Sequence, residues 1–333
     1  YRRIAEETLD YVPPEYGARL TRLVEEGGGW ILLQSNSHPN ALDGIDPGRA
    51  GRDMLPRLKE IPAVTLGRKL NWCIAPWPAP GWARQVHPEL EPAAAFERLR
   101  AELFHVCRLD EPDPADAWRR RCDELSQIAR RLTERRFDAV RYTGPGTDLT
   151  IGLLPSGTWD VAVFDTVRGV RHLPNIPTEE VFTTPDPSRA DGFVTATRPL
   201  EYTGSLIDGI RVRFENGRAV EVGSATNTGV LRAATSKDVR AASLGEVALV
   251  DRFSRVGALE TIFWNTLLDE NAASHIAFGQ GIPYLVEDES DRAKVNASDI
   301  HIDFMIGSPE VDVDGITRTG DVVPVLRGGT WQI

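Results

Sequence analysis

Hydrophobic and polar positions divide the chain into two regions of different texture. In the first region, apolar residues recur at helical spacing over 87–106 and 115–136, and runs such as WILLQS (30–35) predict strands between the helices. Near residue 140 the pattern changes to short strands separated by turn residues. This order predicts an α/β fold (α+β), with an N-terminal α/β domain over 1–142 and a strand-rich C-terminal domain over 143–333.

The clearest strand signal in the second region is IRVRFENGRAVEV, residues 210–222. Two alternating runs flank Asn216-Gly217, a pair that accepts the positive φ angles of a type I′ turn. We therefore predict a β-hairpin centred on these two residues.

Residues 115–136 predict an amphipathic helix whose apolar face includes Trp118, Cys122 and Leu125. Its other face is crowded with arginine, interleaved with aspartate and glutamate. Such a pattern is typical of a solvated helix face, so we assign these arginines no part in function.

Composition excludes several classes of protein. The 333 residues contain 38 basic and 49 acidic side chains, a net charge of -11, which disfavours a nucleic-acid partner. No apolar stretch approaches the ~18 residues that span a bilayer, so no membrane partner is expected.

Cys73, Cys107 and Cys122 show no metal or disulfide spacing and indicate a reducing, cytoplasmic location. The chain starts at Tyr1 without a methionine, and we expect residues to be missing before it.

The apolar run HIDFMIGS (301–308) carries a histidine and an aspartate on one face of a predicted strand. A local hydrogen bond between His301 and Asp303 is one interpretation. A metal site is the other, because imidazole and carboxylate are common ligands of zinc, cobalt, manganese and iron. The second interpretation requires further ligands elsewhere in the chain.

Other acidic residues stand in apolar surroundings. Glu246 is the one charge in LGEVALV, and Glu180 precedes Val-Phe in NIPTEEVFTTP, where we expect Glu179 to face solvent. Buried glutamates are rare unless they are paired or bind a metal. In LLDENAASHIAFG, Asn271 is a good N-cap, which predicts that a helix carrying His275 begins there. Glu270 would lie just before that cap, either as a helix-dipole partner or as a ligand.

Five stretches together resemble the thermophilic aminopeptidase (M29) family of metallopeptidases over nearly all of residues 140–333. They are NIPTEEVFTTPD, RPLEYTGSLI, LGEVALV, NTLLDENAASHIAFG and HIDFMIGSPEVDVDGI, in that order. In the first region, PNALDGIDPGR and WCIAPWPAPGWA are also similar to the family. Members of the family begin with a further βα segment that is absent here.

The resemblance implies two divalent ions, zinc, cobalt or manganese, bound by six side chains. The implied ligands are Glu180, Glu246, Glu270, His275, His301 and Asp303. One ion would use Glu180, His301 and Asp303, the other Glu270 and His275, and Glu246 would bridge them. Two such ions can activate a shared water and stabilise an oxyanion, so Glu246 is also a predicted catalytic residue. The implied activity is the removal of N-terminal residues from short peptides, by a homodimer.

One position departs from the family pattern. A family tyrosine follows the histidine of HIALGxxY by seven residues, and Ile282 stands there in this chain. A phenol near the metals would stabilise the oxyanion, and we predict that Tyr284, two residues on, replaces it.

Two alternatives stay open at this point. His275, His301 and Asp303 also match the two-histidine, one-carboxylate triad of non-haem Fe(II) oxygenases. The loss of the tyrosine would equally fit an inactive metal-binding relative.

Overall fold

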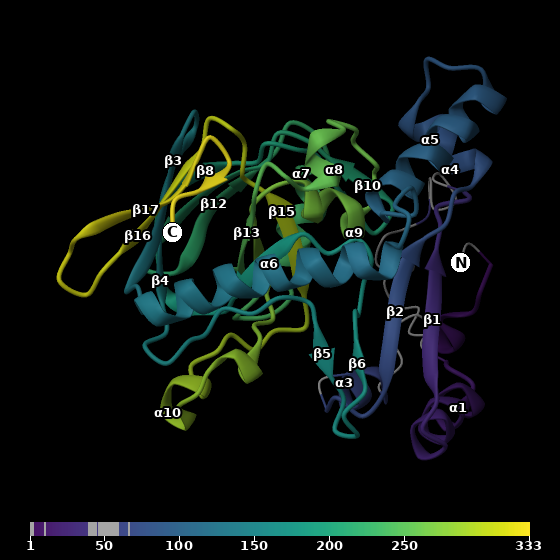
Figure 1. Cartoon of the computed structure of the whole chain (residues 1–333), viewed down its shortest axis with the longest axis horizontal. Helices are drawn as coiled ribbons and strands as arrows, with labels where there is room; N and C mark the ends of the chain where they lie inside the picture. The colour runs from purple at the N-terminus through teal and green to yellow at the C-terminus, as the bar shows by residue number, and fades with distance from the viewer. Residues whose placement is uncertain (1–2, 10, 39–44, 46–59, 66) are drawn as a thin grey trace. The chain divides into compact units, whose positions relative to one another are not determined.

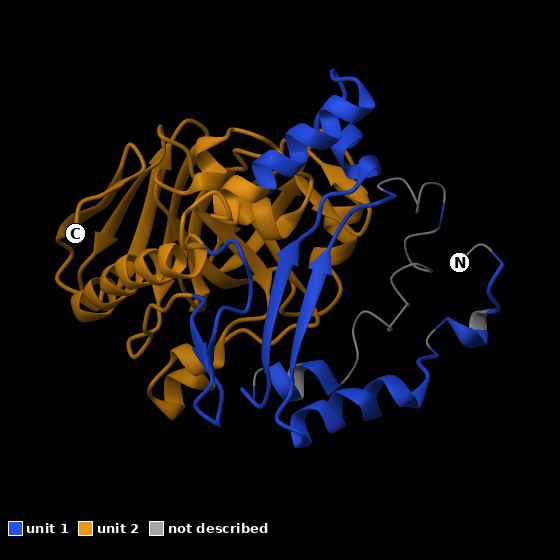
Figure 2. Cartoon of the chain, turned by 45° about the vertical axis from the view of Figure 1, so that its right-hand side comes forward, with its two compact units in different colours: residues 1–103, 162–178 blue, residues 104–161, 179–333 orange. Residues whose placement is uncertain are grey.

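The fold is α/β, as the sequence pattern predicts. The structure, a computed structural model, describes residues 3–9, 11–38, 45, 60–65 and 67–333. Contacts divide the chain into two compact units, residues 1–103 with 162–178 (unit 1) and residues 104–161 with 179–333 (unit 2) (Figure 2). The boundary expected between residues 142 and 143 falls within a strand of unit 2, β3 (Ala139–Gly144).

Unit 1 is built around a short parallel sheet. Its elements are η1 (Glu6–Thr8), α1 (Pro14–Glu25), β1 (Gly29–Gln34), α3 (Glu60–Thr65), β2 (Asn71–Pro76), α4 (Pro80–Val86), most of α5 (Pro92–Val106), β5 (Phe164–Asp165) and β6 (Arg171–His172). The strand predicted at 30–35 is β1, and it pairs with β2 in parallel. Leu20, Val64 and Leu70 form a buried cluster beside this pair.

Unit 2 contains two larger sheets (Figure 1). The eight-stranded sheet has the order β12-β11-β8-β4-β3-β16-β17-β18, and the four-stranded sheet has the order β15-β14-β13-β7. The strands of the large sheet are β3 (Ala139–Gly144), β4 (Thr147–Leu153), β8 (Pro185–Thr195), β11 (Arg211–Glu215), β12 (Arg218–Gly223), β16 (Asp312–Ile316), β17 (Val322–Arg327) and β18 (Thr330–Trp331). Those of the small sheet are β7 (Glu180–Thr183), β13 (Leu244–Val250), β14 (His275–Gly279) and β15 (His301–Met305).

Helices and short strands complete unit 2. They are α6 (Pro114–Arg135), β9 (Leu200–Tyr202), β10 (Ser205–Ile207), α7 (Thr228–Thr235), α8 (Arg255–Ala258), α9 (Thr266–Asp269), η3 (Glu270–Ala272), η4 (Pro283–Leu285) and α10 (Glu289–Arg292). α6 contacts β7, the edge strand of the small sheet. No helix among the described residues is long and apolar enough to cross a membrane.

The two sheets of unit 2 meet through aromatic side chains. Phe278 of β14 stacks on Phe304 of β15, with ring centroids 5.1 Å apart, and lies 5.9 Å from Phe214 of β11 in the large sheet. All three rings are buried. Burial of such rings stabilises this layer by roughly 1.5–3 kcal/mol for each side chain. One face of the small sheet is therefore occupied by the core, and only the other face is left for chemistry.

Several predicted elements are confirmed. The hairpin at 210–222 is β11–β12, and Asn216 and Gly217 have φ angles of 49° and 79°, as a type I′ turn requires. The expected helices are α5 and α6. The three cysteines are free.

The predicted helix beginning at Asn271 is wrong. Residues 270–272 form the short helix η3, and His275–Gly279 form β14. β14 lies between β13 and β15, and every residue in it is buried. A five-residue apolar run that is hydrogen-bonded on both sides gains more as a central strand than as an isolated helical turn.

Candidate metal centre

The predicted ligands of the small sheet share one face. In the ladder, Glu180 lies opposite Val250, His275 lies opposite Ala248, and Glu246 lies in line with Asp303 through Ala277. Residues two apart on a strand point the same way, and so do cross-strand partners. Glu180, Glu246, His275, His301 and Asp303 therefore project from the face opposite the phenylalanine core.

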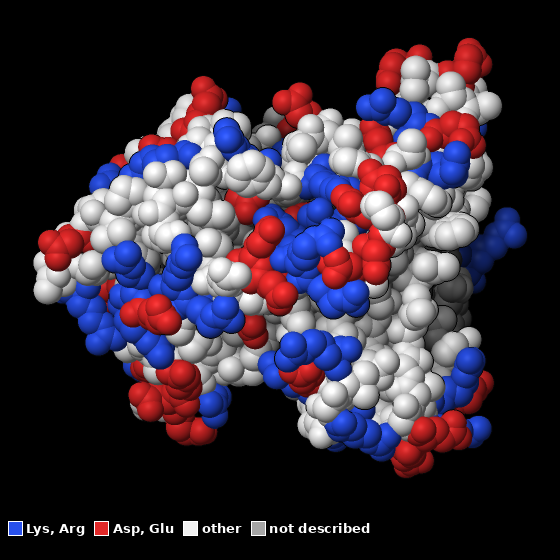
Figure 3. Space-filling model, in the orientation of Figure 1, with Lys and Arg blue, Asp and Glu red and all other residues white. Residues whose placement is uncertain are grey.

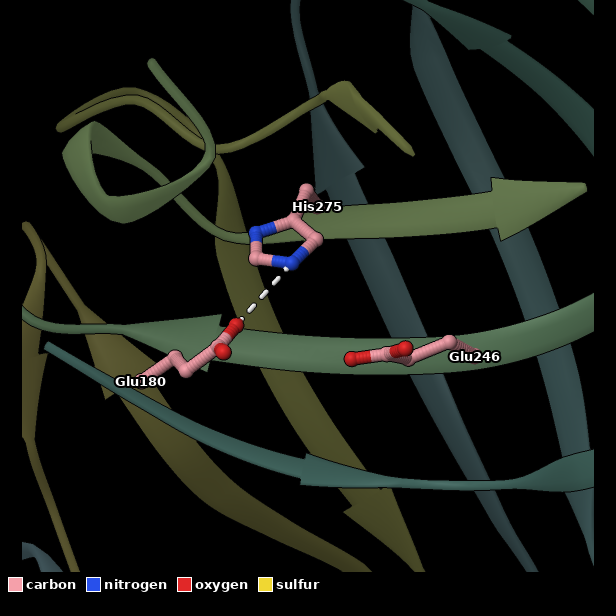
Figure 4. A group of neighbouring side chains, drawn as sticks. All are labelled: Glu180, Glu246 and His275. Carbon is pink, nitrogen blue, oxygen red and sulfur yellow. Dashed lines mark ion pairs between the residues drawn. The ribbon is translucent and has the colours of Figure 1, made fainter. Parts of the chain in front are cut away.

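Three of these side chains form the first cluster, Glu180, Glu246 and His275, all of them buried (Figure 4). Each offers one ligand atom, and these atoms lie within 4.8 Å of one another. His275 Nε2 is 3.1 Å from Glu180 Oε2.

The second cluster contains Glu246, His301 and Asp303 under the same distance limit. His301 Nε2 lies 3.3 Å from Glu246 Oε2 and 3.4 Å from Asp303 Oδ1. The His301 side chain is 37% exposed, so this cluster lies at the open margin of the site. Glu246 belongs to both clusters, as a bridging ligand would. By proximity Glu180 groups with His275, whereas the resemblance implies a grouping with His301 and Asp303.

Both histidines are oriented by the backbone. His275 Nδ1 lies 3.2 Å from the carbonyl of Ala273, and His301 Nδ1 lies 2.8 Å from the carbonyl of Gln280. A hydrogen on Nδ1 satisfies each carbonyl and leaves a lone pair on Nε2 of the neutral ring. In both cases Nε2 then faces carboxylate oxygen, so a proton or a metal ion must lie between two electron-rich atoms. Apart from this contact with His275, Glu180 Oε2 has no hydrogen-bond partner among the described residues.

The pKa values show how strongly the site favours positive charge. Burial lowers the pKa of His275, but the contact and the charge of Glu180 outweigh it and raise that pKa to about 10. His301 behaves alike: the loss of hydration is outweighed by Asp303 and Glu246, which raise its pKa well above the usual value. Burial raises the pKa of Glu246, whereas the charge of His301 overcomes the effect of burial and lowers the pKa of Asp303.

Glu270 lies in η3 and is half-buried. Burial, and then the charges of Asp303 and Glu180, raise its pKa well above the usual value. Glu270 is outside both clusters, and the effect of Asp303 and Glu180 on its pKa indicates that it lies near their charges. It is the sixth predicted ligand.

Tyr284 lies in η4 and is 37% exposed. Ile282, at the family's tyrosine position, precedes η4 and donates its backbone N–H to Thr184 Oγ1 over 3.3 Å. The predicted role of Tyr284 in catalysis stays a prediction.

Glu179 does not face solvent as expected. Its side chain is completely buried, with Arg121 2.6 Å and Arg108 2.7 Å away. Arg121, expected on the solvated face of α6, is itself buried. A pair of adjacent glutamates cannot be ranked by burial from local pattern alone, because the basic partners come from 58 and 71 residues away.

The donor set fits divalent cations. Carboxylates and neutral imidazoles are the ligands of zinc, cobalt and manganese sites. The three donors of the first cluster come from β7, β13 and β14, and those of the second come from β13 and from two positions on β15.

Comparison with known proteins agrees with this chemistry. A model of the thermophilic metalloprotease family (M29) matches residues 1–331. Aminopeptidase T of Thermus aquaticus is 40% identical over 338 residues, covering 99% of this chain and 83% of the relative. Aminopeptidase PepS of Streptococcus thermophilus is 37% identical, covering 98% of this chain and 81% of the relative. The solved structure of wild-type AmpT from Thermus thermophilus superposes with a TM-score of 0.91 at 38% identity, covering 100% of this chain and 83% of that chain.

Proposed function

Because the chain belongs to the thermophilic metalloprotease (M29) family of metal-dependent aminopeptidases, we propose that it cleaves N-terminal residues from short peptides at a dinuclear metal centre. The proposed ligands are the five residues on the small sheet and Glu270 of η3. The observation that carries the proposal is the orientation of His275 and His301, whose Nε2 atoms face carboxylates while Nδ1 is tied to the backbone.

We assign one ion to the cluster of Glu180, Glu246 and His275, and the other to the cluster of Glu246, His301 and Asp303. Glu270, whose pKa is raised by the charges of Asp303 and Glu180, would complete the first ion's ligands. Zinc, cobalt and manganese all suit these donors. Such ions would lower the pKa of a bound water and polarise the scissile carbonyl.

The chain's own residues set the conditions for that chemistry. The buried Glu246 carboxylate belongs to both clusters, so as a shared ligand it would hold the two ions beside the reacting water, which is the catalytic role that we propose for it. The exposed margin at His301 gives a peptide access to the site. We propose that the Tyr284 phenol donates a hydrogen bond to the developing oxyanion.

The proposal extends to the setting of the enzyme. Residues 143–333 would form the catalytic domain, the protein would work as a homodimer, and short peptides would be its substrates. Free thiols at Cys73, Cys107 and Cys122 support a cytoplasmic location.

The two alternatives raised by the sequence are separated from this proposal in different ways. A single iron triad would use His275, His301 and Asp303, but it would leave the buried carboxylates of Glu180 and Glu246 without a cation. An inactive metal-binding relative would keep the same ligands, and turnover of aminoacyl substrates separates it from an aminopeptidase.

Substitution of Glu246 by glutamine tests the function directly. Glu246→Gln keeps the size of the side chain but removes the shared charge, so we expect kcat/KM on aminoacyl chromogenic substrates to fall by about 10²-fold or more. Glu221→Gln, on an exposed strand position, is the matched control and should retain activity. Full activity of Glu246→Gln, with an unchanged circular dichroism spectrum, would refute the proposal.

A further inference from the structure

Glu179 immediately precedes the proposed ligand Glu180 but takes no part in the clusters. Its carboxylate is completely buried and receives hydrogen bonds from Arg121 Nε at 2.6 Å and Arg108 Nη2 at 2.7 Å. Both arginines are themselves buried. The side chain of Glu179 is thus fixed on the side of α6, which restricts where its neighbour can point.

Arg121 also binds the strand beside Glu180. Its Nη1 and Nη2 donate to the two oxygens of Asp251, each at 3.1 Å. Asp251 follows Val250, and Val250 is the cross-strand partner of Glu180. The Arg121 guanidinium therefore joins Glu179 to Asp251, and so fixes the start of β7 against the end of β13. Trp331 Nε1 donates to Asp251 at 2.7 Å and completes this arrangement.

Asn271 makes a second connection, to the segment that carries Glu270. Its side chain is completely buried; Oδ1 accepts the backbone N–H of Glu179 at 2.6 Å, and Nδ2 donates to the carbonyl of Leu267 at 2.8 Å. Asn271 follows Glu270 directly in the chain. This one amide therefore sets the separation between the backbone beside Glu180 and the backbone beside Glu270.

We propose that Arg121 and Asn271 are positioning residues that hold Glu180 and Glu270 in place to bind the same metal ion. The inference rests on the proposed function and adds to it the means by which two distant segments present their carboxylates together. Buried ion pairs are poor contributors to fold stability, because desolvation cancels most of their attraction. Fixing geometry is the better-attested use of such a pair, and here the geometry it fixes is that of a ligand.

The test is a cobalt titration of metal-free protein, followed by the visible absorption of bound Co²⁺ in the presence of a competing chelator. Arg121→Lys keeps the charge but replaces three separate donor nitrogens by one, so the planar fork that spans Glu179 and Asp251 is lost. We expect wild-type protein to bind two ions, and the variant to lose about 10- to 100-fold in affinity for one of them, with the other changed much less. Asn271→Leu removes the hydrogen bond between η3 and the backbone of Glu179, so it should weaken the binding of the same ion.

Glu102→Gln is the control. Glu102 is a buried carboxylate of unit 1 that contacts His87 Nε2 at 2.8 Å and Arg98 Nε at 2.7 Å, so its loss should lower the melting temperature without changing either cobalt affinity. If Arg121→Lys fails to fold, Asn271→Leu decides the question. Wild-type affinities in both folded variants would overturn the positioning role alone, whereas wild-type protein that binds no cobalt would overturn the proposed function as well.

Discussion

At the scale of residues, the site depends on two imidazoles that each have one nitrogen committed to the backbone. Ala273 and Gln280 supply the carbonyls, so His275 and His301 can present only Nε2 to the carboxylates. Such a carbonyl fixes both the tautomer and the orientation of a ligand histidine. Without a cation, the facing carboxylates retain a proton on each ring, so a metal ion at the proposed centre would compete with that proton for the same place.

This competition predicts that metal binding releases protons. The pKa of His275 is raised to about 10, so its ring still carries the extra proton at pH 8 in metal-free protein, and metal binding must displace it. Affinity should therefore rise with pH, by about tenfold per unit for each proton released. Calorimetry of zinc binding in two buffers of different ionisation enthalpy counts these protons. Release should decrease in His275→Ala, and no release from wild-type protein would contradict the predicted protonation.

Single residues also show where reasoning from the sequence ends. His301 and Asp303 could be predicted as a pair, because strand alternation alone places them on one face. Glu179 and Glu180 could not be distinguished, because burial of Glu179 depends on Arg108 and Arg121, far away in the chain. One local signal was available in α6. Arg121 lies among the apolar positions Trp118 and Cys122, which places it on the buried face of the helix.

At the scale of elements, the ligands come together because four strands of one sheet share a face. The β11–β12 hairpin could be predicted, since an Asn-Gly turn between alternating runs is a local signal. β14 could not, because HIAFG after an Asn-Ala-Ala stretch fits the start of a helix equally well. Only its two neighbours, β13 and β15, decide in favour of a strand.

Gly279 tests this dependence on the ladder. It has a φ of 92° and pairs with His301, and a Cβ added there would lie 2.1 Å from the carbonyl oxygen of Ile300. Gly320 has a similar φ of 89° with nothing within 4 Å of its Cβ position, so it is the matched control for backbone strain alone. We expect Gly279→Ala to lower the free energy of unfolding by about 1–3 kcal/mol more than Gly320→Ala does. If urea unfolding gave the same loss of unfolding free energy for both variants, β14 and β15 would tolerate separation at Gly279.

At the scale of the whole molecule, charge is distributed in a way that suits a small peptide rather than a polyanion. The net charge is -11, and on the face shown in Figure 3 basic and acidic side chains are interspersed. Three of the acidic residues, Glu180, Glu246 and Asp303, lie in the two clusters of unit 2, and with Glu270 they make four proposed ligand carboxylates whose charge two divalent cations would balance. The proposed ligands all belong to unit 2, so the proposed metal centre lies within that unit.

The most direct test of this account is metal content per chain, measured by elemental analysis after reconstitution with zinc and dialysis. We predict two ions in wild-type protein, and one ion in each of His275→Ala and His301→Ala, because each histidine belongs to a different cluster. Glu246→Gln should weaken both ions. One ion per wild-type chain, or the loss of both ions in either histidine variant while the protein stays folded, would contradict the dinuclear centre.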